Sequence, residues 1–232
     1  MAEFPESPME AREFMERWLP QAFAEAELPP GSDAVRVRLG VLLEGEGGGE
    51  WVCHIEGGRM RVEAGSREDA AFTIVQPVHD WRGALWESRG GAVGQGAAAF
   101  FRPGSAPPPG SQGPTGGAPS GRALAEMEKL QGVIRMLVVG EDEGPGEWRV
   151  DFKLGTGPIP EEPTTTIRIQ AEDAAAMQRG ELDPMTAFMT GRMQVEGDMT
   201  LMMQMQAIQM QAAQQEAGGG ASSGGGSGPT GA

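Results

Sequence analysis

Residues 180–211, GELDPMTAFMTGRMQVEGDMTLMMQMQAIQMQ, are the most strongly patterned stretch of the 232-residue chain. They carry eight of its fifteen methionines. Methionine is unbranched and polarizable, so a surface rich in it adapts to apolar partners of varying shape. Ordinary cores more often use Leu, Ile and Val, whose rotamers are better defined. Two interpretations stay open at this point: a methionine-rich core or dimer face, and a deformable apolar pocket for a flexible ligand.

Cap and turn residues divide this region into short elements. Glu172 and Asp173 favour the start of a helix, where acidic side chains meet the positive end of the dipole, and Gly180 favours its end in the left-handed conformation. Asp183 and Pro184 predict the cap and first turn of a second helix. That second helix places three apolar residues on one side: Met185, Phe188 and Met189.

A strand and a long helix follow. We expect Gly191 to end the second helix and residues 192–196 to form a strand, because Met193 and Val195 alternate with polar residues. Gly197-Asp198 predicts a turn that caps the last helix.

The last helix, Met199 to Glu216, is the strongest functional candidate. No residue from 199 to 215 is charged, whereas a helix on a solvated surface usually has a charged face. The pattern therefore indicates contact with protein or ligand on more than one side, and it fits a plain core helix as well. One face at helical spacing holds Leu201, Met202, Met205, Ile208, Gln209 and Ala212. Met203, Gln206 and Met210 broaden this apolar face.

The pattern G-E-L-D-P-M-x-A-F-M-T-G-R-M-x-V-x-G-D-M, from Gly180 through Met199, resembles the signature of the sterol carrier protein type two (SCP-2) sterol-transfer family. The resemblance is strong over residues 147–211. It implies an α+β fold, with a mostly antiparallel sheet of five strands covered by helices around an apolar tunnel that accepts sterols, fatty acids, fatty acyl-CoA or phospholipids. It also implies that the last helix closes the tunnel. The residues that we expect to bind the ligand are Met177, Met185, Phe188, Met189, Met193, Val195, Leu201, Met202, Met205 and Ile208.

Two low-complexity segments divide the chain. Residues 103–121 are rich in Pro and Gly and have no apolar period, which is typical of a linker. Residues 217–232 predict a disordered tail with nothing to bury. The sequence therefore predicts an N-terminal unit over residues 5–102 and a C-terminal lipid-binding domain over residues 122–216.

The N-terminal unit predicts a helix followed by a β-meander. Residues 7–26 have a helical apolar stripe, with Ser7 and Glu10 as a capping box and Pro20 kinking or dividing the helix. Residues 35–43 alternate as a half-buried strand, and the segments WVCHI and RMRVEA complete the meander.

The C-terminal unit repeats this layout. Trp51 and Trp148 follow equivalent acidic, Gly-rich turns, and Ile74 and Ile167 would be equivalent strand positions. We therefore expect a tandem duplication in which the first copy is degenerate, because it has no counterpart of the signature. The sequence leaves open whether the two copies share one continuous sheet.

Composition argues against several functional classes. A formal net charge of −15 with only two lysines disfavours binding to nucleic acid and to an anionic membrane leaflet. No apolar run approaches the roughly 18 residues of a membrane span, so we expect no stable membrane insertion. The acidic residues 1–10 do not resemble a signal peptide, and the single Cys53 cannot form an internal disulfide. Together these features predict a soluble cytoplasmic protein.

The sequence shows no arrangement of residues that would support catalysis or metal binding. His54 and His79 are the only histidines, and both lie in the half without the signature. Cys53 beside His54 cannot form a dyad in a regular strand, since neighbouring side chains point to opposite faces. No Walker A sequence occurs, no G-x-S-x-G motif precedes the Gly- and Ser-rich tail, and Cys and His lack metal-ligand spacing. We expect no enzyme activity, no metal and no cofactor.

The sequence therefore predicts a noncatalytic lipid-binding or carrier protein for a sterol, a fatty acid or a fatty acyl-CoA. Two alternatives stay open. One is a protein-interaction module that kept the fold without a functional pocket and forms a homodimer. The other is an accessory domain that presents lipid to an enzyme acting on acyl-CoA or sterol substrates.

Overall fold

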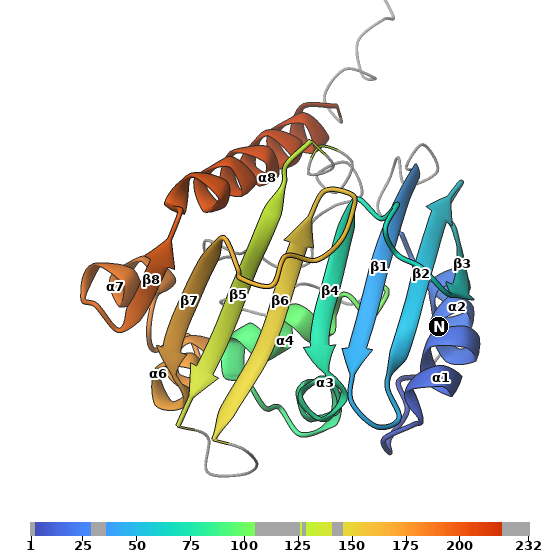
Figure 1. The fold of residues 1–232 in the computed structure, drawn as a ribbon, viewed down its shortest axis with the longest axis horizontal. Coiled ribbons are helices and arrows are strands. Elements are labelled where there is room, and N and C mark those ends of the chain that lie inside the picture. Colours follow the sequence, from blue (N-terminus) through green and yellow to red (C-terminus); the bar gives the residue numbers. More distant parts are fainter. Residues whose placement is uncertain (1–2, 29–35, 105–125, 127–128, 141–145, 220–232) are drawn as a thin grey trace, which may run out of the picture.

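A single eight-stranded sheet runs through both halves of the chain, in the order β3-β2-β1-β4-β6-β5-β7-β8 (Figure 1). The computed structural model describes residues 3–28, 36–104, 126, 129–140 and 146–219. Its strands are β1 (Arg36–Glu44), β2 (Gly49–Glu56), β3 (Arg59–Ala64), β4 (Phe72–Pro77), β5 (Gly132–Val139), β6 (Glu147–Leu154), β7 (Thr165–Gln170) and β8 (Met193–Gly197).

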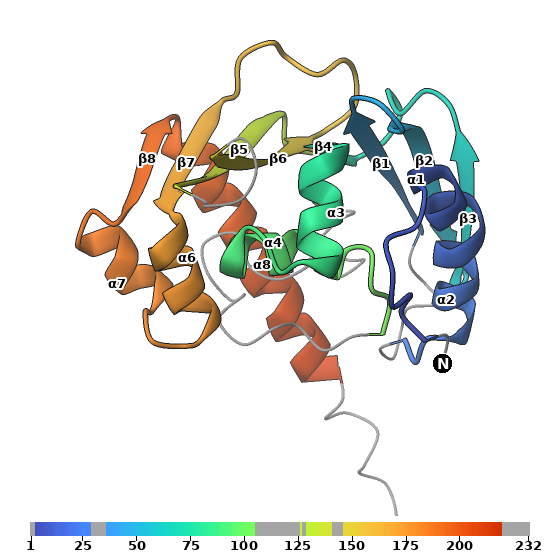
Figure 2. The same ribbon diagram turned by 90° about the horizontal axis from the view of Figure 1, so that it is seen from below.

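The sheet is mixed but mostly antiparallel, as predicted. Only β1–β4 and β5–β7 pair in parallel, and the other neighbouring strands pair antiparallel. The labelled helices lie on one side of the sheet, and the connection between β6 and β7 crosses its other side (Figure 2). These helices are α1 (Ala11–Glu13), the π-helix η1 (Phe14–Trp18), α2 (Leu19–Glu25), α3 (Val78–Trp86), α4 (Gly91–Ala99), α6 (Ala171–Gln178), α7 (Pro184–Met189) and α8 (Met199–Gly219). The α+β class is therefore confirmed.

The two halves have the same strand order within this sheet. In each half an antiparallel hairpin precedes a strand parallel to its first strand, and a helix follows directly: β1, β2, β4 and α3, then β5, β6, β7 and α6. Trp51 lies opposite Val41, and Trp148 lies opposite Val138. The predicted equivalence of Ile74 with Ile167 is wrong by two residues, because Ile74 pairs with Val41 whereas Val138 pairs with Ile169.

Direct pairing of β4 with β6 joins the halves, from Phe72 opposite Leu154 to Val75 opposite Asp151. This answers the question that the sequence leaves open, because the halves share one continuous sheet. Among the described residues, the second half alone adds α7, β8 and α8, and the first half alone adds β3 and the helical segments α1, η1, α2 and α4. Common strand order does not establish a duplication, and the units over residues 5–102 and 122–216 stay a prediction.

The N-terminal helix begins later than predicted. Its first residue is Ala11, and Glu10 occupies the cap position without a side-chain cap hydrogen bond, so the capping box at Ser7 is wrong. Pro20 stands in the first turn of α2, directly after the π-helical segment η1. The helix continues through residues 11–25 without a break, and the change near Pro20, whose N–H is missing, is the π-helical segment before it.

Helix α4, with the sequence GAVGQGAAA, occupies the centre of the helical layer (Figures 1 and 2). Its small residues permit close approach to α6: a Cβ added at Gly91 would stand 2.7 Å from the carbonyl carbon of Ala174. Gly90 packs in the same way against the Trp148 ring. Both glycines have positive φ, 78° for Gly90 and 53° for Gly91, which other residues adopt only with strain.

Two predictions fall outside the described residues. These are most of the linker over 103–121 and the tail beyond residue 219. Residues 217–219, which we expected to belong to the tail, are the last turn of α8.

Candidate functional site

The signature region folds into the short elements that its cap residues predict. Helix α6 starts at Ala171, and Gly180 follows it with a φ of 73°. The carboxylate of Asp183 accepts a hydrogen bond from the Thr186 backbone N–H at 3.0 Å, which caps α7. Gly191 follows α7, also with positive φ. Strand β8 begins one residue later than predicted, and its alternation is confirmed: Met193 is buried while Gln194 and Glu196 are exposed.

The junction between β8 and α8 is held by polar contacts to the start of β7. The Asp198 backbone N–H donates to the Thr164 carbonyl at 3.0 Å, and the Thr165 hydroxyl donates to the Asp198 carbonyl. The Asp198 carboxylate accepts from the Thr200 N–H at 2.7 Å, and hydrogen bonds from the Thr200 hydroxyl and N–H lower the pKa of Asp198. Gly197 is required here, since an added Cβ would stand 2.3 Å from the Thr164 carbonyl oxygen. The first turn of α8 is thus fixed to the sheet.

Beyond this junction, α8 contacts the rest of the chain through one apolar stripe. Leu201, Met202 and Met205 are buried, and Ile208 is half-buried. Met203 and Met210 are 57% and 63% exposed. Among the described side chains of residues 201–211, none makes a hydrogen bond or ion pair with the body of the protein. Among the described residues, the buried side chains of α8 therefore lie on one side of the helix, and the side chains of Gln206, Gln209 and Ala212 lie outside the described set.

The ten predicted ligand-binding residues differ in exposure: seven lie in or against one apolar core, and three are exposed. Five are buried in one apolar core and are called the methionine cluster below: Met177, Met193, Leu201, Met202 and Met205. Val195 and Ile208 are partly buried against that core. The three residues on α7 point to solvent instead: Met185 is 57%, Phe188 is 36% and Met189 is 78% exposed. The short helix α7 buries Ala187, so its larger apolar side chains lie on the opposite side.

The sheet supplies apolar partners that the sequence reasoning did not name. Ile134, Met136, Ile167 and Ile169, from β5 and β7, belong to the same core as the methionine cluster. Leu201 packs on Gly132, because a Cβ added there would stand 2.6 Å from the Leu201 Cδ2. The period-two pattern of β5 and β7 could have identified these residues as inward-facing.

Charged groups near the signature lie at its surface and are paired. Arg192 contacts the Asp173 carboxylate at 2.9 Å, and Arg179 contacts Glu181 at 2.7 Å. The Arg179 guanidinium lowers the pKa of Glu181. Within the described residues no three His, Cys, Asp or Glu side chains are grouped as a metal site would need. All five side chains of the methionine cluster are apolar, and the charged groups named here lie outside it.

Two titratable residues of the N-terminal half, Cys53 and Asp80, are buried. Burial raises the pKa of the Cys53 thiol to about 12. Asp80, which is buried, accepts a hydrogen bond from the Arg149 backbone N–H at 3.0 Å and lies 3.1 Å from His79 Nδ1. The Trp148 indole donates to the Asp80 carbonyl at 2.9 Å. These contacts tie α3 of the first half to β6 of the second.

Solved structures of related proteins align with part of this chain. The sterol carrier protein domain 2 of Helicoverpa armigera covers 38% of the chain at 29% identity, with a TM-score of 0.28. A palmitated SCP2L2 from Aedes aegypti covers 39% at 17% identity, with a TM-score of 0.26. At these scores we draw no structural argument from either.

The curated relatives likewise match only part of this chain. Sterol carrier protein 2 of Bos taurus is 31% identical over 93 residues, which is 37% of this chain and 17% of that protein. Hydroxysteroid dehydrogenase-like protein 2 of Xenopus tropicalis is 30% identical over 87 residues, which is 35% of this chain and 20% of that protein. The chain thus spans a fifth or less of the length of these relatives.

The described helices include none with the length and apolar character needed to cross a membrane.

A family match covers the segment from before β5 into α8, including the whole signature: residues 117–210 match the SCP-2 sterol transfer family. The C-terminal part of this chain is therefore a domain of the SCP-2 sterol transfer family.

Proposed function

We propose that this chain is a noncatalytic carrier that binds a sterol, a fatty acid or a fatty acyl chain between α8 and the inner face of β5, β7 and β8. The observation that carries the proposal is the methionine cluster, which lies within the SCP-2 sterol transfer segment and includes three residues of α8. Homology to sterol carrier proteins supports lipid binding, and the position of the ligand is our inference.

Binding would draw its free energy from the transfer of apolar surface out of water. Each methylene of an acyl chain gains roughly 0.8 kcal/mol on burial. Methionine side chains have three rotatable bonds and can rearrange around ligands of different shape at little strain. The cluster has no charged member, so an apolar ligand would leave no ionised group without solvent or a partner.

Helix α8 would act as the lid. Its first turn is fixed by Asp198, whereas its described residues beyond Thr200 are held by apolar contacts alone. A ligand that replaces these contacts with similar ones would shift α8 at small net cost, by a lid motion around the Gly197-Asp198 junction. This motion would open a path for the ligand at no cost in side-chain hydrogen bonds, because the described side chains of residues 201–211 make none with the body of the protein.

A pair of adjacent residues on α8 provides the test. Met202 is 5% exposed and Met203 is 57% exposed, so Met202→Glu introduces a charge at a buried position of the helix and Met203→Glu introduces the same charge at an exposed one. Titration with a fluorescent fatty acid should give saturable binding to the wild type and to Met203→Glu. Circular dichroism and thermal unfolding of each variant report whether the fold is intact, and Met202→Gln provides a milder change if Met202→Glu does not fold. Loss of affinity for both Met202 variants with Met203→Glu unaffected supports the proposal; no saturable binding to the wild type overturns it.

A second candidate function is self-association or protein interaction, and a specific observation favours it. The large apolar side chains that are exposed among the described residues all lie between positions 185 and 210: Met185, Phe188, Met189, Met199, Met203 and Met210. Exposed apolar patches of this kind mark interaction sites. Sedimentation velocity on the wild type and on Met189→Glu would detect a dimer that the substitution disperses; a monomer at all concentrations would exclude the homodimer.

The remaining candidate is an accessory role in which the chain presents lipid to an enzyme. Its relatives are five or more times longer than the matched segment, and some are named as dehydrogenase-like proteins. Co-purification with an enzyme that acts on acyl-CoA or sterols would support it. In either role we infer that the chain itself performs no chemistry, and turnover of such a substrate by the purified chain would contradict this.

A further inference from the structure

The corner formed by β1, β2 and β3 has an unusual charge pattern on the sheet face that is turned away from the helices. Arg38, His54 and Arg61 lie directly opposite one another on the three strands. No carboxylate stands between the two arginines in this row, whereas opposite charges in directly opposed positions stabilise a sheet. The neighbouring row adds Arg36 and Arg59 on either side of Glu56.

This corner carries the opposite charge balance to the whole chain. Four arginines face three carboxylates there, those of Glu56, Glu63 and Asp69, while the chain has a net charge of −15. The carboxylates are half or more exposed, and exposed ion pairs contribute at most about 1 kcal/mol each. They can therefore turn away when a better anion arrives.

Of the two arginines that line the cleft, Arg38 has the longer carboxylate contact. Its guanidinium stands 3.6 Å from Asp69, beyond a good hydrogen-bond distance, and makes no side-chain hydrogen bond with the described residues. Arg36, by contrast, lies 2.9 Å from Glu56. The five N–H donors of an arginine form a planar fork that fits carboxylate and phosphate groups.

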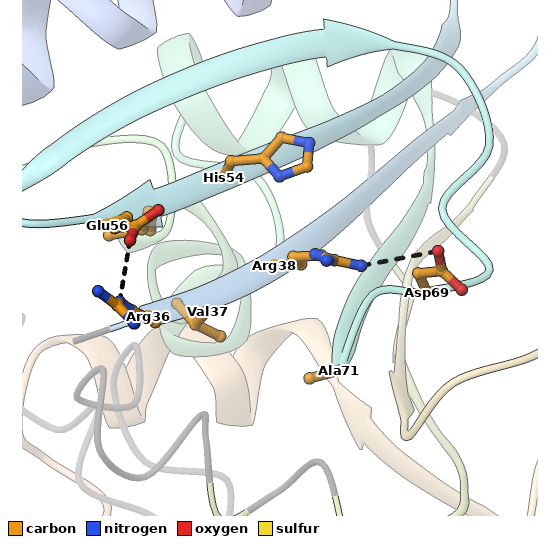
Figure 3. Close-up of a pocket in the computed structure, with 8 residues that line it drawn as sticks. Arg36, Val37, Arg38, His54, Glu56, Asp69 and Ala71 are labelled. Atoms are coloured by element: carbon orange, nitrogen blue, oxygen red, sulfur yellow. Dashed lines mark ion pairs between the residues drawn. The ribbon is translucent and has the colours of Figure 1, made fainter.

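An open cleft of about 390 Å³ gives access to these groups (Figure 3). Arg36, Arg38 and His54 line it together with the carboxylates of Glu56 and Asp69. Val37, Ile55 and Ala71 complete the lining, but Val37 and Ala71 are buried, and Val37 and Ile55 pack into the core on the helix side of the sheet. The volume is within the range of small-molecule sites, which runs from roughly 300 to 1,000 Å³. The cleft thus combines cationic groups with the aliphatic stems of its arginine side chains.

We propose that this cleft binds a small organic anion, with its phosphate or carboxylate group on Arg38 and His54 and its organic part against the aliphatic stems of Arg36 and Arg38. The site lies in the N-terminal half, on the opposite sheet face from the methionine cluster, and is independent of the proposed lipid site. It gives the half that lacks the SCP-2 signature a binding function of its own.

The environment of His54 agrees with this assignment. Desolvation lowers its pKa, and the nearby Arg61 and Arg38 charges lower it further. The charged groups around the ring are Arg38 on β1, Glu56 on β2, Arg61 and Glu63 on β3, and Asp69 before β4, with Glu63 at 3.3 Å from Nε2. A bound anion would oppose the arginine charges, so it should raise the pKa of His54 and bind more tightly as pH falls.

The test uses NMR titration of the two histidine rings in the full chain. Phenyl phosphate, inorganic phosphate and vesicles containing phosphatidic acid are added separately, with sodium chloride at equal ionic strength as the control. We expect phenyl phosphate to bind more tightly than inorganic phosphate and to raise the pKa of His54, while His79, in a separate environment against Asp80, serves as an internal reference. Arg38→Gln should weaken binding by about 10-fold or more, since a hydrogen bond to a charged group contributes roughly 1.5–3 kcal/mol.

Arg12→Gln is the matched control, because Arg12 is also an exposed guanidinium with one carboxylate neighbour, Glu16 at 3.5 Å. It should bind phenyl phosphate as the wild type does. The proposal is overturned by any of three results: a response no larger than that to chloride, equal affinity for the two phosphates, or equal behaviour of the two arginine variants. A response to vesicles alone overturns it as well, in favour of a membrane headgroup.

Discussion

Replacement of Gly91 by alanine tests how tightly the two halves are packed. Gly91 has a φ of 53°, and an added Cβ would stand 2.7 Å from the carbonyl carbon and 2.8 Å from the carbonyl oxygen of Ala174. Positive φ costs a non-glycine residue roughly 1–2 kcal/mol. Overpacking against backbone atoms, which cannot turn away, adds typically about 1–3 kcal/mol. We therefore expect Gly91→Ala to lower the free energy of unfolding by about 2–5 kcal/mol.

Gly180→Ala separates the two contributions. Gly180 has a φ of 73°, and an added Cβ would meet nothing within 4 Å, so this variant should lose only the roughly 1–2 kcal/mol of backbone strain. Urea unfolding followed by circular dichroism gives both free energies, with the slope m as the check for two-state behaviour. Equal losses for the two variants would refute the close contact between α4 and α6.

Two further predictions concern buried titratable groups. Burial is the largest influence on the Asp80 carboxyl group and raises its pKa above the ordinary 3.8. The native state therefore binds the carboxyl proton more tightly than the unfolded state does. The stability gained from this proton is complete below pH 3.8 and is lost as pH rises through the native pKa. Asp80→Asn should remove that part of the pH dependence in urea unfolding, and an unchanged profile would contradict it. Because the pKa of the buried Cys53 thiol is about 12, an aromatic disulfide reagent at pH 8 should label it only after denaturation; stoichiometric labelling of the native protein would show that the thiol is accessible.

The local structure of the signature region could be predicted because each element end depends on a short-range interaction. Asp183 caps α7 and Gly180 follows α6 with positive φ, as their side chains dictate. Ser7 shows the limit of such reasoning: a serine before an apolar helical stripe indicates a cap, yet the helix begins at Ala11.

Long-range features escaped prediction for a different physical reason. The pairing of β4 with β6 depends on which strand edges meet, and nothing within either strand encodes its neighbour. Helix α4 was not predicted, because glycine disfavours helix and the segment has no amphipathic stripe. Its uncharged run of small residues is the signal for a closely packed buried helix.

The candidate site was predicted in part. Met193, Leu201, Met202 and Met205 are buried as an apolar face at helical and strand spacing requires. Met185 and Met189 have the same residue type and regular spacing but are exposed, because α7 is only six residues long and buries Ala187. Apolar periodicity identifies a face without indicating what covers it.

Methionine-methyl NMR tests the central claim most directly, since the methionines are distributed over both halves. Protein labelled at the methionine methyl groups would be titrated with a fatty acid. A ligand beneath α8 predicts saturable shifts that are largest for Met193, Met202 and Met205, with Met15 and Met60 of the N-terminal half unchanged. Absence of saturable shifts, or shifts centred on Met15 and Met60, would contradict lipid binding at α8.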